Sequence, residues 1–269
     1  MNANSKVRPK WFYPLIFLGI ILINIIPSYS ELPYAPQDAQ DVIINLLMVA
    51  IEPYRAYAPI FHLATILIAC GMLWKPARMG RLVAGYMGLN FLIIGLAQTM
   101  GQTEKYGFVV HLAALATMLL LGIAWLVVAV RGQLLLSRQK LQLPEYGLLL
   151  LALLAYWGPY RVVGGTIQPD FDPRLLLISP DYGLMFCFTT PVFLLGLILF
   201  RAQGSQFAYR LTAFSGLLYG LFNLTHWFNP DTWWMGFLHL PLLLISAYAL
   251  FLPKIERLGK KRIPQPPVS

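Results

Sequence analysis

Residues 106–130 read YGFVVHLAALATMLLLGIAWLVVAV, a run without a single Asp, Glu, Lys or Arg. A helix of about 20 apolar residues is long enough to cross the hydrocarbon core of a bilayer. Seven similar runs occur at 11–30, 56–74, 82–103, 146–160, 182–200, 211–230 and 232–253. None shows the alternating apolar and polar pattern of a membrane barrel, and a helix satisfies its own backbone groups in lipid. The sequence therefore predicts an all-α polytopic membrane protein with eight transmembrane helices.

Charge is scarce and is sorted between alternate loops. Only 12% of residues are charged, against about a quarter in soluble domains, and 58% are hydrophobic. One set of alternate loops carries sixteen of the twenty basic residues: Lys6, Arg8, Lys10, Lys75, Arg78, Arg81, Arg131, Arg138, Lys140, Arg201, Arg210, Lys254, Arg257, Lys260, Lys261 and Arg262. The other set carries nine of the eleven acids: Glu31, Asp38, Asp41, Glu52, Glu104, Asp170, Asp172, Asp181 and Asp231.

This sorting explains the net charge of +9 without a nucleic-acid partner. Because Lys and Arg in short loops stay on the cytoplasmic side, both termini are expected to be cytoplasmic. The partners expected are the lipid bilayer, with the basic tail on anionic headgroups, and a second membrane protein. The expected location is the cell membrane or an inner membrane.

The two halves of the chain are similar after a shift of 128 residues, which aligns Gly88 with Gly216 and His111 with His239. We interpret 1–132 as a first four-helix unit, 133–142 as a basic cytoplasmic linker, 143–254 as a second unit and 255–269 as a basic tail. An even number of spans per unit makes the units parallel-related. Chance similarity between apolar helices is the alternative. The first run also resembles a cleavable signal peptide, although the repeat requires it as a helix.

The middle of every predicted span lacks Asp, Glu and Lys. This disfavours ion-coupled carriers and retinal proteins, which need an ionisable group at depth. The titratable groups left within the spans are four histidines, His62, His111, His226 and His239, all expected in the outer half of the bilayer. Neutral imidazole suits haem iron or a transition metal, so we predict a cofactor site there. The alternative is that each histidine is an interfacial residue bonded to a carbonyl or water.

A second candidate site is a polar pocket beneath the outer loops. It would use Arg55 and Arg161 to anchor an anionic or quinone-like headgroup, with Gln98 and Asn223 as polar lining. Asp170, Asp172, Arg174 and Asp181 would lie nearby. An interfacial set of salt bridges with snorkelling arginines is the alternative.

The layout of two four-helix units with outer-side histidines resembles that of haem A synthases. The resemblance implies paired histidines on the second and fourth helix of each unit, where His62, His111 and His239 stand here. Thr189 or a neighbour stands where the fourth would be expected, and the family's Glu-x-x-His-Arg-type motif is absent, since Leu63 follows His62.

The leading hypothesis is a membrane-embedded subunit that binds haem or a metal for redox or haem-handling work. The competing hypotheses are a passive or partner-dependent transporter with a path between the units, and an accessory subunit without a site of its own. Whether the protein is an enzyme stays open.

Overall fold

The computed structural model describes residues 11–163, 166–228, 230 and 233–261, with the backbone alone at 252–261, and this part of the chain is mostly helical. Its α-helices are α1 (Phe12–Ile23), α2 (Ala39–Val49), α3 (Ala58–Trp74), α4 (Pro76–Gln98), α5 (Leu112–Arg131), α6 (Leu143–Trp157), α7 (Leu175–Ile178), α8 (Phe186–Leu199), α9 (Gln206–Phe222) and α10 (Met235–Lys261). The strands are β1 (Tyr29–Ser30), β2 (Met100–Thr103), β3 (Gly107–Val110), β4 (Tyr160–Val163) and β5 (Thr166–Pro169). Three 3-10 helices, η1 (Pro36–Asp38), η2 (Glu52–Tyr57) and η3 (Asn223–Phe228), complete the described elements. Five residues of the charge pattern used to predict the orientation lie outside the described residues: Lys6, Arg8, Lys10, Asp231 and Arg262.

Three helical stretches in the described part are long and apolar enough to cross a membrane: α4, α5 and the run Pro36–Trp74 that ends in α3. Shorter apolar helices are α1, α6, α8 and residues Met235–Phe251 of α10. Each of the eight apolar runs in the sequence overlaps one of the longer helices. The structure thus confirms a helical chain with segments suited to a membrane, while the number of spans and the repeat stay predictions.

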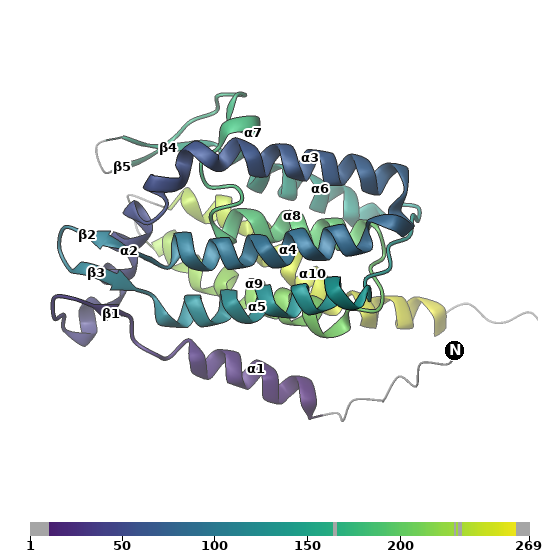
Figure 1. The fold of residues 1–269 in the computed structure, drawn as a ribbon, viewed down its shortest axis with the longest axis horizontal. Helices are drawn as coiled ribbons and strands as arrows, with labels where there is room; N and C mark the ends of the chain where they lie inside the picture. Colours follow the sequence, from purple (N-terminus) through teal and green to yellow (C-terminus); the bar gives the residue numbers. More distant parts are fainter. Residues whose placement is uncertain (1–10, 164–165, 229, 231–232, 262–269) are drawn as a thin grey trace, which may run out of the picture.

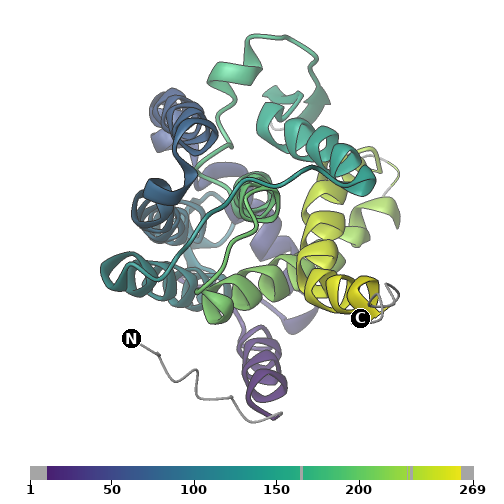
Figure 2. The ribbon, with the colours of Figure 1, turned by 90° about the vertical axis from the view of Figure 1, so that its right-hand side faces the viewer.

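Helix α8 lies at the centre of the bundle. Seen along the helices in Figure 2, it is surrounded by α3, α4, α6, α9 and α10, and it packs against α6, α9, α10 and α4. Ten of its fourteen residues are buried, so its apolar side chains form the middle of the main core. Helix α1 lies outside this ring and packs against α5 and α9.

The two ends of the bundle differ in structure (Figure 1). All the described strands, together with α2 and α7, gather at one end, which we call the capped end. The connections between α3 and α4, α5 and α6, and α8 and α9 lie at the other end, the basic end. The acid-rich and base-rich loops of the sequence therefore occupy opposite ends of the bundle.

The cap includes a three-stranded sheet of order β1-β3-β2, in which β2 and β3 form an antiparallel hairpin pairing Met100 with Val110 and Thr103 with Gly107. The hairpin replaces the ends of the predicted spans 82–103 and 106–130, so α4 ends at Gln98 and α5 begins at Leu112. Gly107 has a φ of +65°, which a glycine adopts at little cost and which lets the chain reverse. The short helix α2 packs on this sheet, and its Val42 and Leu46 form a small core with Tyr106 and Val109 of the hairpin.

The basic end contains a buried ion pair between Arg201 and Glu145, both almost fully enclosed. Glu145 also accepts a hydrogen bond from the backbone N–H of Gln142 at 2.8 Å, which caps the start of α6. Arg201 follows α8, and the backbone of Leu135 pairs with that of Gln203 beside it. The ion pair therefore joins the first turn of α6 to the turn between α8 and α9.

We expect Arg201→Met to destabilise the protein by about 3–5 kcal/mol, because Glu145 would keep a buried charge without a partner. The double variant Glu145→Leu/Arg201→Met should regain most of that loss. Arg161→Met is the matched control, since its ion pair with Asp170 is exposed and worth about 1 kcal/mol or less. Thermal unfolding of the detergent-purified variants measures these effects. Equal melting temperatures for Arg201→Met and Arg161→Met would contradict the expectation.

Candidate functional site

The four predicted histidines lie in three different places. His226 of η3 and His239 of α10 lie together, with nearly parallel rings whose centroids are 5.0 Å apart. His111 caps the start of α5, where its Nδ1 lies 3.2 Å from the hydroxyl of Ser28. His62 lies on α3 and shares no contact with the other three. In the described part of the chain, no three His, Cys, Asp or Glu side chains are placed to hold a metal ion.

His62 is the most buried of the four, with 1% of its surface exposed. Its Nε2 donates to the carbonyl of Ser179 at 3.1 Å, so Nδ1 is the acceptor nitrogen. The ring packs against Tyr156 and Tyr182, at centroid distances of 4.6 and 4.9 Å. Helix α3, α6 and the loop before α8 thus meet at one imidazole.

The loop before α8 is anchored through the backbone of Gly183, whose φ is +83°. Its N–H donates to the hydroxyl of Thr189 at 2.8 Å, and its carbonyl accepts the amide of Asn90 at 2.9 Å. A Cβ at this position would overlap the ring of Phe61, so only glycine fits. The loop is therefore fixed to both α4 and α8.

A chain of three hydroxyl groups continues from this loop into the bundle. The hydroxyl of Tyr182 lies 2.8 Å from that of Thr65, which lies 3.0 Å from that of Tyr86. The hydroxyl of Tyr86 also donates to the carbonyl of Phe61 at 3.2 Å. These residues join the capped end to the middle of α3 and α4.

The hydroxyl chain ends at a groove of about 300 Å³ between α3, α4, α6 and α8. Thr65 and Tyr86 are its polar lining residues, and the remainder are apolar or glycine: Ile68, Ala69, Met72, Leu73, Val83, Met87, Leu149, Val192, Phe193, Leu195, Gly196, Leu197, Leu199 and Phe200. Leu73 and Leu149 are exposed, so the groove reaches the surface between α3 and α6. None of the predicted site residues lines it.

Several buried polar atoms around the loop before α8 have no hydrogen-bond partner among the described residues. They are Nδ1 of His62, Oδ1 of Asn90, Oγ of Ser179, Oγ1 of Thr190 and Nε of Arg55. Buried polar groups in native proteins are nearly always paired with protein or with ordered water. This layer between the cap and the groove is therefore a place for bound water or for polar atoms of a ligand.

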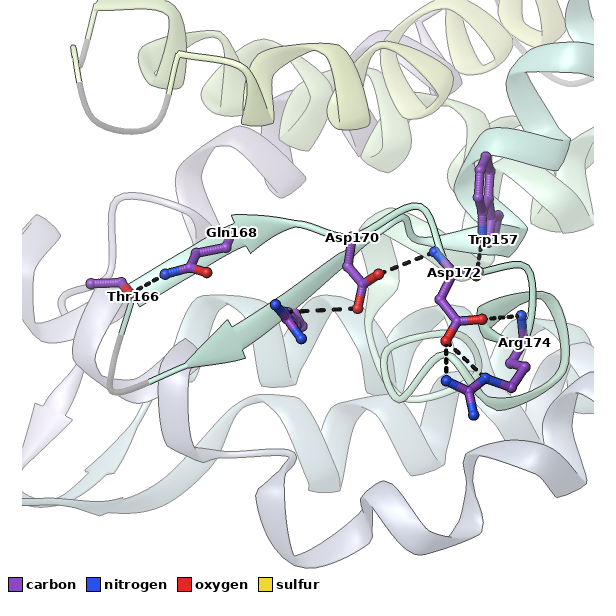
Figure 3. Close-up of polar contacts among 7 residues, drawn as sticks. Trp157, Thr166, Gln168, Asp170, Asp172 and Arg174 are labelled. Carbon is purple, nitrogen blue, oxygen red and sulfur yellow. Dashed lines mark hydrogen bonds and ion pairs between the residues drawn. The ribbon is translucent and has the colours of Figure 1, made fainter.

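The predicted polar pocket of arginines and acids divides into an exposed and a buried part. Figure 3 shows Asp172 on the surface of the cap in contact with both Asp170 and Arg174. Its N–H donates to Asp170 at 3.1 Å, and its carboxylate accepts from the Arg174 guanidinium at 2.8 Å. The indole of Trp157 donates to the Asp172 carbonyl at 3.0 Å. Arg161 is also exposed there and lies 3.9 Å from Asp170. These contacts hold the β4–β5 hairpin in place.

The other part consists of the half-buried Arg55 and the buried Asp181. Arg55 pairs with Glu52 at 3.0 Å and acts electrostatically on the enclosed carboxyl of Asp181. Asp181 also shares a hydrogen bond with the hydroxyl of Tyr160. Burial raises the pKa of Asp181 to about 6, because desolvation disfavours the charged form more than Tyr160 and Arg55 favour it.

The two predicted amides have structural partners at the capped end of α8. The carbonyl oxygen of Gln98 accepts the backbone N–H of Phe186 at 2.8 Å, and the amide of Asn223 donates to the sulfur of Cys187 at 3.2 Å. They fix the first turn of α8 to α4 and η3.

Asp181 gives the folded state a pH dependence of known sign. Its folded pKa lies above the unfolded value of about 3.9, so the folded protein binds more protons between about pH 4 and pH 6 and its stability falls as pH rises through that window. The free energy of unfolding falls by at most about 3 kcal/mol across this window, since each pH unit accounts for about 1.4 kcal/mol.

We expect Asp181→Asn to remove this loss, so that its stability relative to the wild type increases from pH 4 to pH 7. Melting temperatures of the detergent-purified protein across this range measure the difference. Asp170→Asn, on the exposed cap, is the matched control and should keep the pH slope of the wild type. A constant difference between Asp181→Asn and the wild type at all pH values would rule out the buried carboxyl as its source.

The sequence interpretation missed Thr65 and Tyr86, which line the groove, and Tyr182, whose hydroxyl bonds to that of Thr65. A signal was available, since Thr65 and Tyr86 are hydroxyl residues well inside apolar runs. No protein-family model, curated protein or solved structure matches this chain.

Proposed function

We propose that the chain is an integral membrane protein with eight spans and both termini on the cytoplasmic side, and that it binds an apolar-chain small molecule in the groove between α3, α4, α6 and α8. The segregation of acidic and basic loops at opposite ends of the bundle supports this orientation. The exposed faces of the outer helices also support a lipid environment, since Leu63, Leu67 and Leu150 each expose more than half of their surface. Large exposed apolar patches of this kind are rare on soluble monomers.

Side-specific labelling of single cysteines checks the orientation. In a variant without Cys70 and Cys187, we expect a membrane-impermeant maleimide applied to intact cells to label Glu104→Cys at the cap. Arg138→Cys, in the linker at the basic end, should be labelled only after the membrane is opened. Equal labelling of both positions in intact cells would contradict the proposed topology.

The groove is the observation that carries the binding function. Its volume of about 300 Å³ lies at the lower end of the range for small-molecule sites, which are apolar with a few well-placed polar groups. Thr65 and Tyr86 are such groups, and the rest of the lining suits a hydrocarbon chain. Because the groove reaches the surface between two proposed spans, a ligand would enter from the bilayer.

A groove-filling substitution tests this function. Gly196 lines the groove, and a Cβ there would meet only Met72, at 3.8 Å. We expect Gly196→Leu to abolish crosslinking of a long-chain diazirine alcohol to α3 and α8 peptides, as mapped by mass spectrometry. Gly147→Leu is the matched control, since its exposed Cβ would meet nothing within 4 Å. Absence of crosslinks at the groove in the wild type would refute the binding function.

The His226–His239 pair favours haem or metal binding as a second candidate function. Nδ1 of His239 donates to the carbonyl of Met235 at 2.8 Å, which leaves Nε2 as the nitrogen with a lone pair for a metal. Porphyrin nitrogens or water would have to complete the coordination. Absorbance and metal analysis should then show a bound group that His226→Ala/His239→Ala loses and His111→Ala retains. A colourless, metal-free wild type would exclude this candidate.

A transport path between the two halves and an accessory role beside a larger membrane protein remain predictions of the sequence. The bilayer and a membrane-protein partner are the partners we propose.

A further inference from the structure

We propose that the molecule in the groove is an uncharged quinone with an alkyl or isoprenoid tail, and that one of its carbonyl oxygens accepts the hydroxyl proton of Tyr86. This inference rests on the proposed binding function and specifies its ligand. It follows from the direction of the hydroxyl chain, the lack of charge in the lining and the rings at the groove's polar end.

The three hydroxyl groups have a single consistent direction. Each hydroxyl has one proton to donate. Because Tyr86 gives its proton to the carbonyl of Phe61, the bond between Thr65 and Tyr86 must use the proton of Thr65. The bond between Tyr182 and Thr65 must then use the proton of Tyr182. The protons thus point from the loop before α8 towards Tyr86.

The last bond of this chain is the weakest. The distance from the Tyr86 hydroxyl to the Phe61 carbonyl is 3.2 Å, longer than the usual 2.5–3.0 Å between two oxygens, whereas the other two bonds are 2.8 and 3.0 Å. The Phe61 carbonyl also faces the N–H of Thr65, four residues later in α3, as its ordinary helical partner. A ligand oxygen that reaches the Tyr86 hydroxyl from the groove would therefore take its proton while leaving the Phe61 carbonyl bonded.

The lining indicates that the ligand is neutral. None of the described residues that line the groove is charged or a histidine. An ionised carboxylate or phosphate in the groove would lose its hydration without gaining an opposite charge, at a large cost in free energy. A carbonyl oxygen requires only a hydrogen-bond donor, which Tyr86 supplies. Fatty acids and lipid phosphates are therefore disfavoured as groove ligands relative to a quinone or ketone.

Aromatic rings at the polar end favour a planar head. Tyr86 and Phe193 both line the groove and meet edge to face, with centroids 5.5 Å apart. Edge-to-face and offset arrangements are also the preferred packing for a third ring. Met72 and Met87 lie in the same lining and adapt easily to an irregular ligand. A tail would leave past the exposed side chains of Leu73 and Leu149 into the bilayer.

Competition with the diazirine alcohol tests the inference. The competitors are a decyl-substituted benzoquinone, decanoic acid and decane, applied to the full-length detergent-purified protein. We expect the quinone to compete best and the Tyr86→Phe variant to weaken its competition about fivefold, the effect of losing one hydrogen bond. Competition by decane should be unchanged, because decane accepts no hydrogen bond.

Two further variants separate the role of the Tyr86 proton from general damage. Tyr34→Phe is the matched control, since its hydroxyl also donates to a backbone carbonyl, that of Ser28 at 2.7 Å, but at the cap. It should leave quinone competition unchanged. Thr65→Val removes the donor to Tyr86 but keeps the Tyr86 proton, so it should weaken the quinone less than Tyr86→Phe does.

The outcomes distinguish the two proposals. If the diazirine alcohol fails to label the groove of the wild type, the binding function itself is wrong. If it labels the groove but decanoic acid or decane competes as well as the quinone, the groove holds ordinary lipid chains and the quinone assignment is wrong. Unchanged quinone competition in Tyr86→Phe would likewise overturn the role of Tyr86.

Discussion

The burial of α8 is the constraint on which the rest of this bundle depends. A helix that is enclosed by five others can leave no polar group of its ends unpaired without a large cost. At the capped end, Gln98 accepts the N–H of Phe186 and Thr189 accepts the N–H of Gly183. At the basic end, Arg201 turns back towards Ile198 and reaches Glu145. The neighbouring helices are thus positioned by polar contacts at the two ends and by apolar packing between them.

The same constraint accounts for the groove. Helix α3 packs on α4 and α7, and α6 packs on α8 and α7, so α3 and α6 are joined at the cap rather than along their lengths. The face of α8 between them is left to Val192, Gly196 and their apolar neighbours. Since Gly196 has no side chain to fill the space, a groove remains between α3 and α6. A molecule from the bilayer completes this face more readily than water does, because the lining is almost wholly apolar.

The chain of hydroxyl groups makes the end of the groove towards the cap its polar end. Tyr182, Thr65 and Tyr86 come from the loop before α8, from α3 and from α4, so they meet only in the folded chain. The layer above them contains His62 and Asp181, the most enclosed imidazole and carboxyl described near the cap. The polar groups of the capped end are therefore continuous with the polar end of the groove, whereas the His226–His239 pair forms a separate place on η3 and α10.

The sequence by itself determined the helical class, the positions of the helices and the sorting of charge, because apolar run length and loop composition are local properties. It could also single out His62, His111, His226 and His239 as unusual, since any titratable residue in an apolar run is rare. It could not show that they separate into three places, because helices of similar apolarity carry no mark of which neighbours they choose. Nor could it show that α8 is central, as its run is as apolar as those that face outward.

Only the tertiary structure decided the groove, the Tyr182–Thr65–Tyr86 chain and the burial of Arg201 with Glu145. Each depends on side chains from segments far apart in sequence, such as Thr65 and Tyr182, or Glu145 and Arg201. The physical reason is that a hydrogen bond or a cavity is set by distances of a few ångströms between elements. Hydropathy and charge in the sequence limit which elements can pack together, but they do not set those distances.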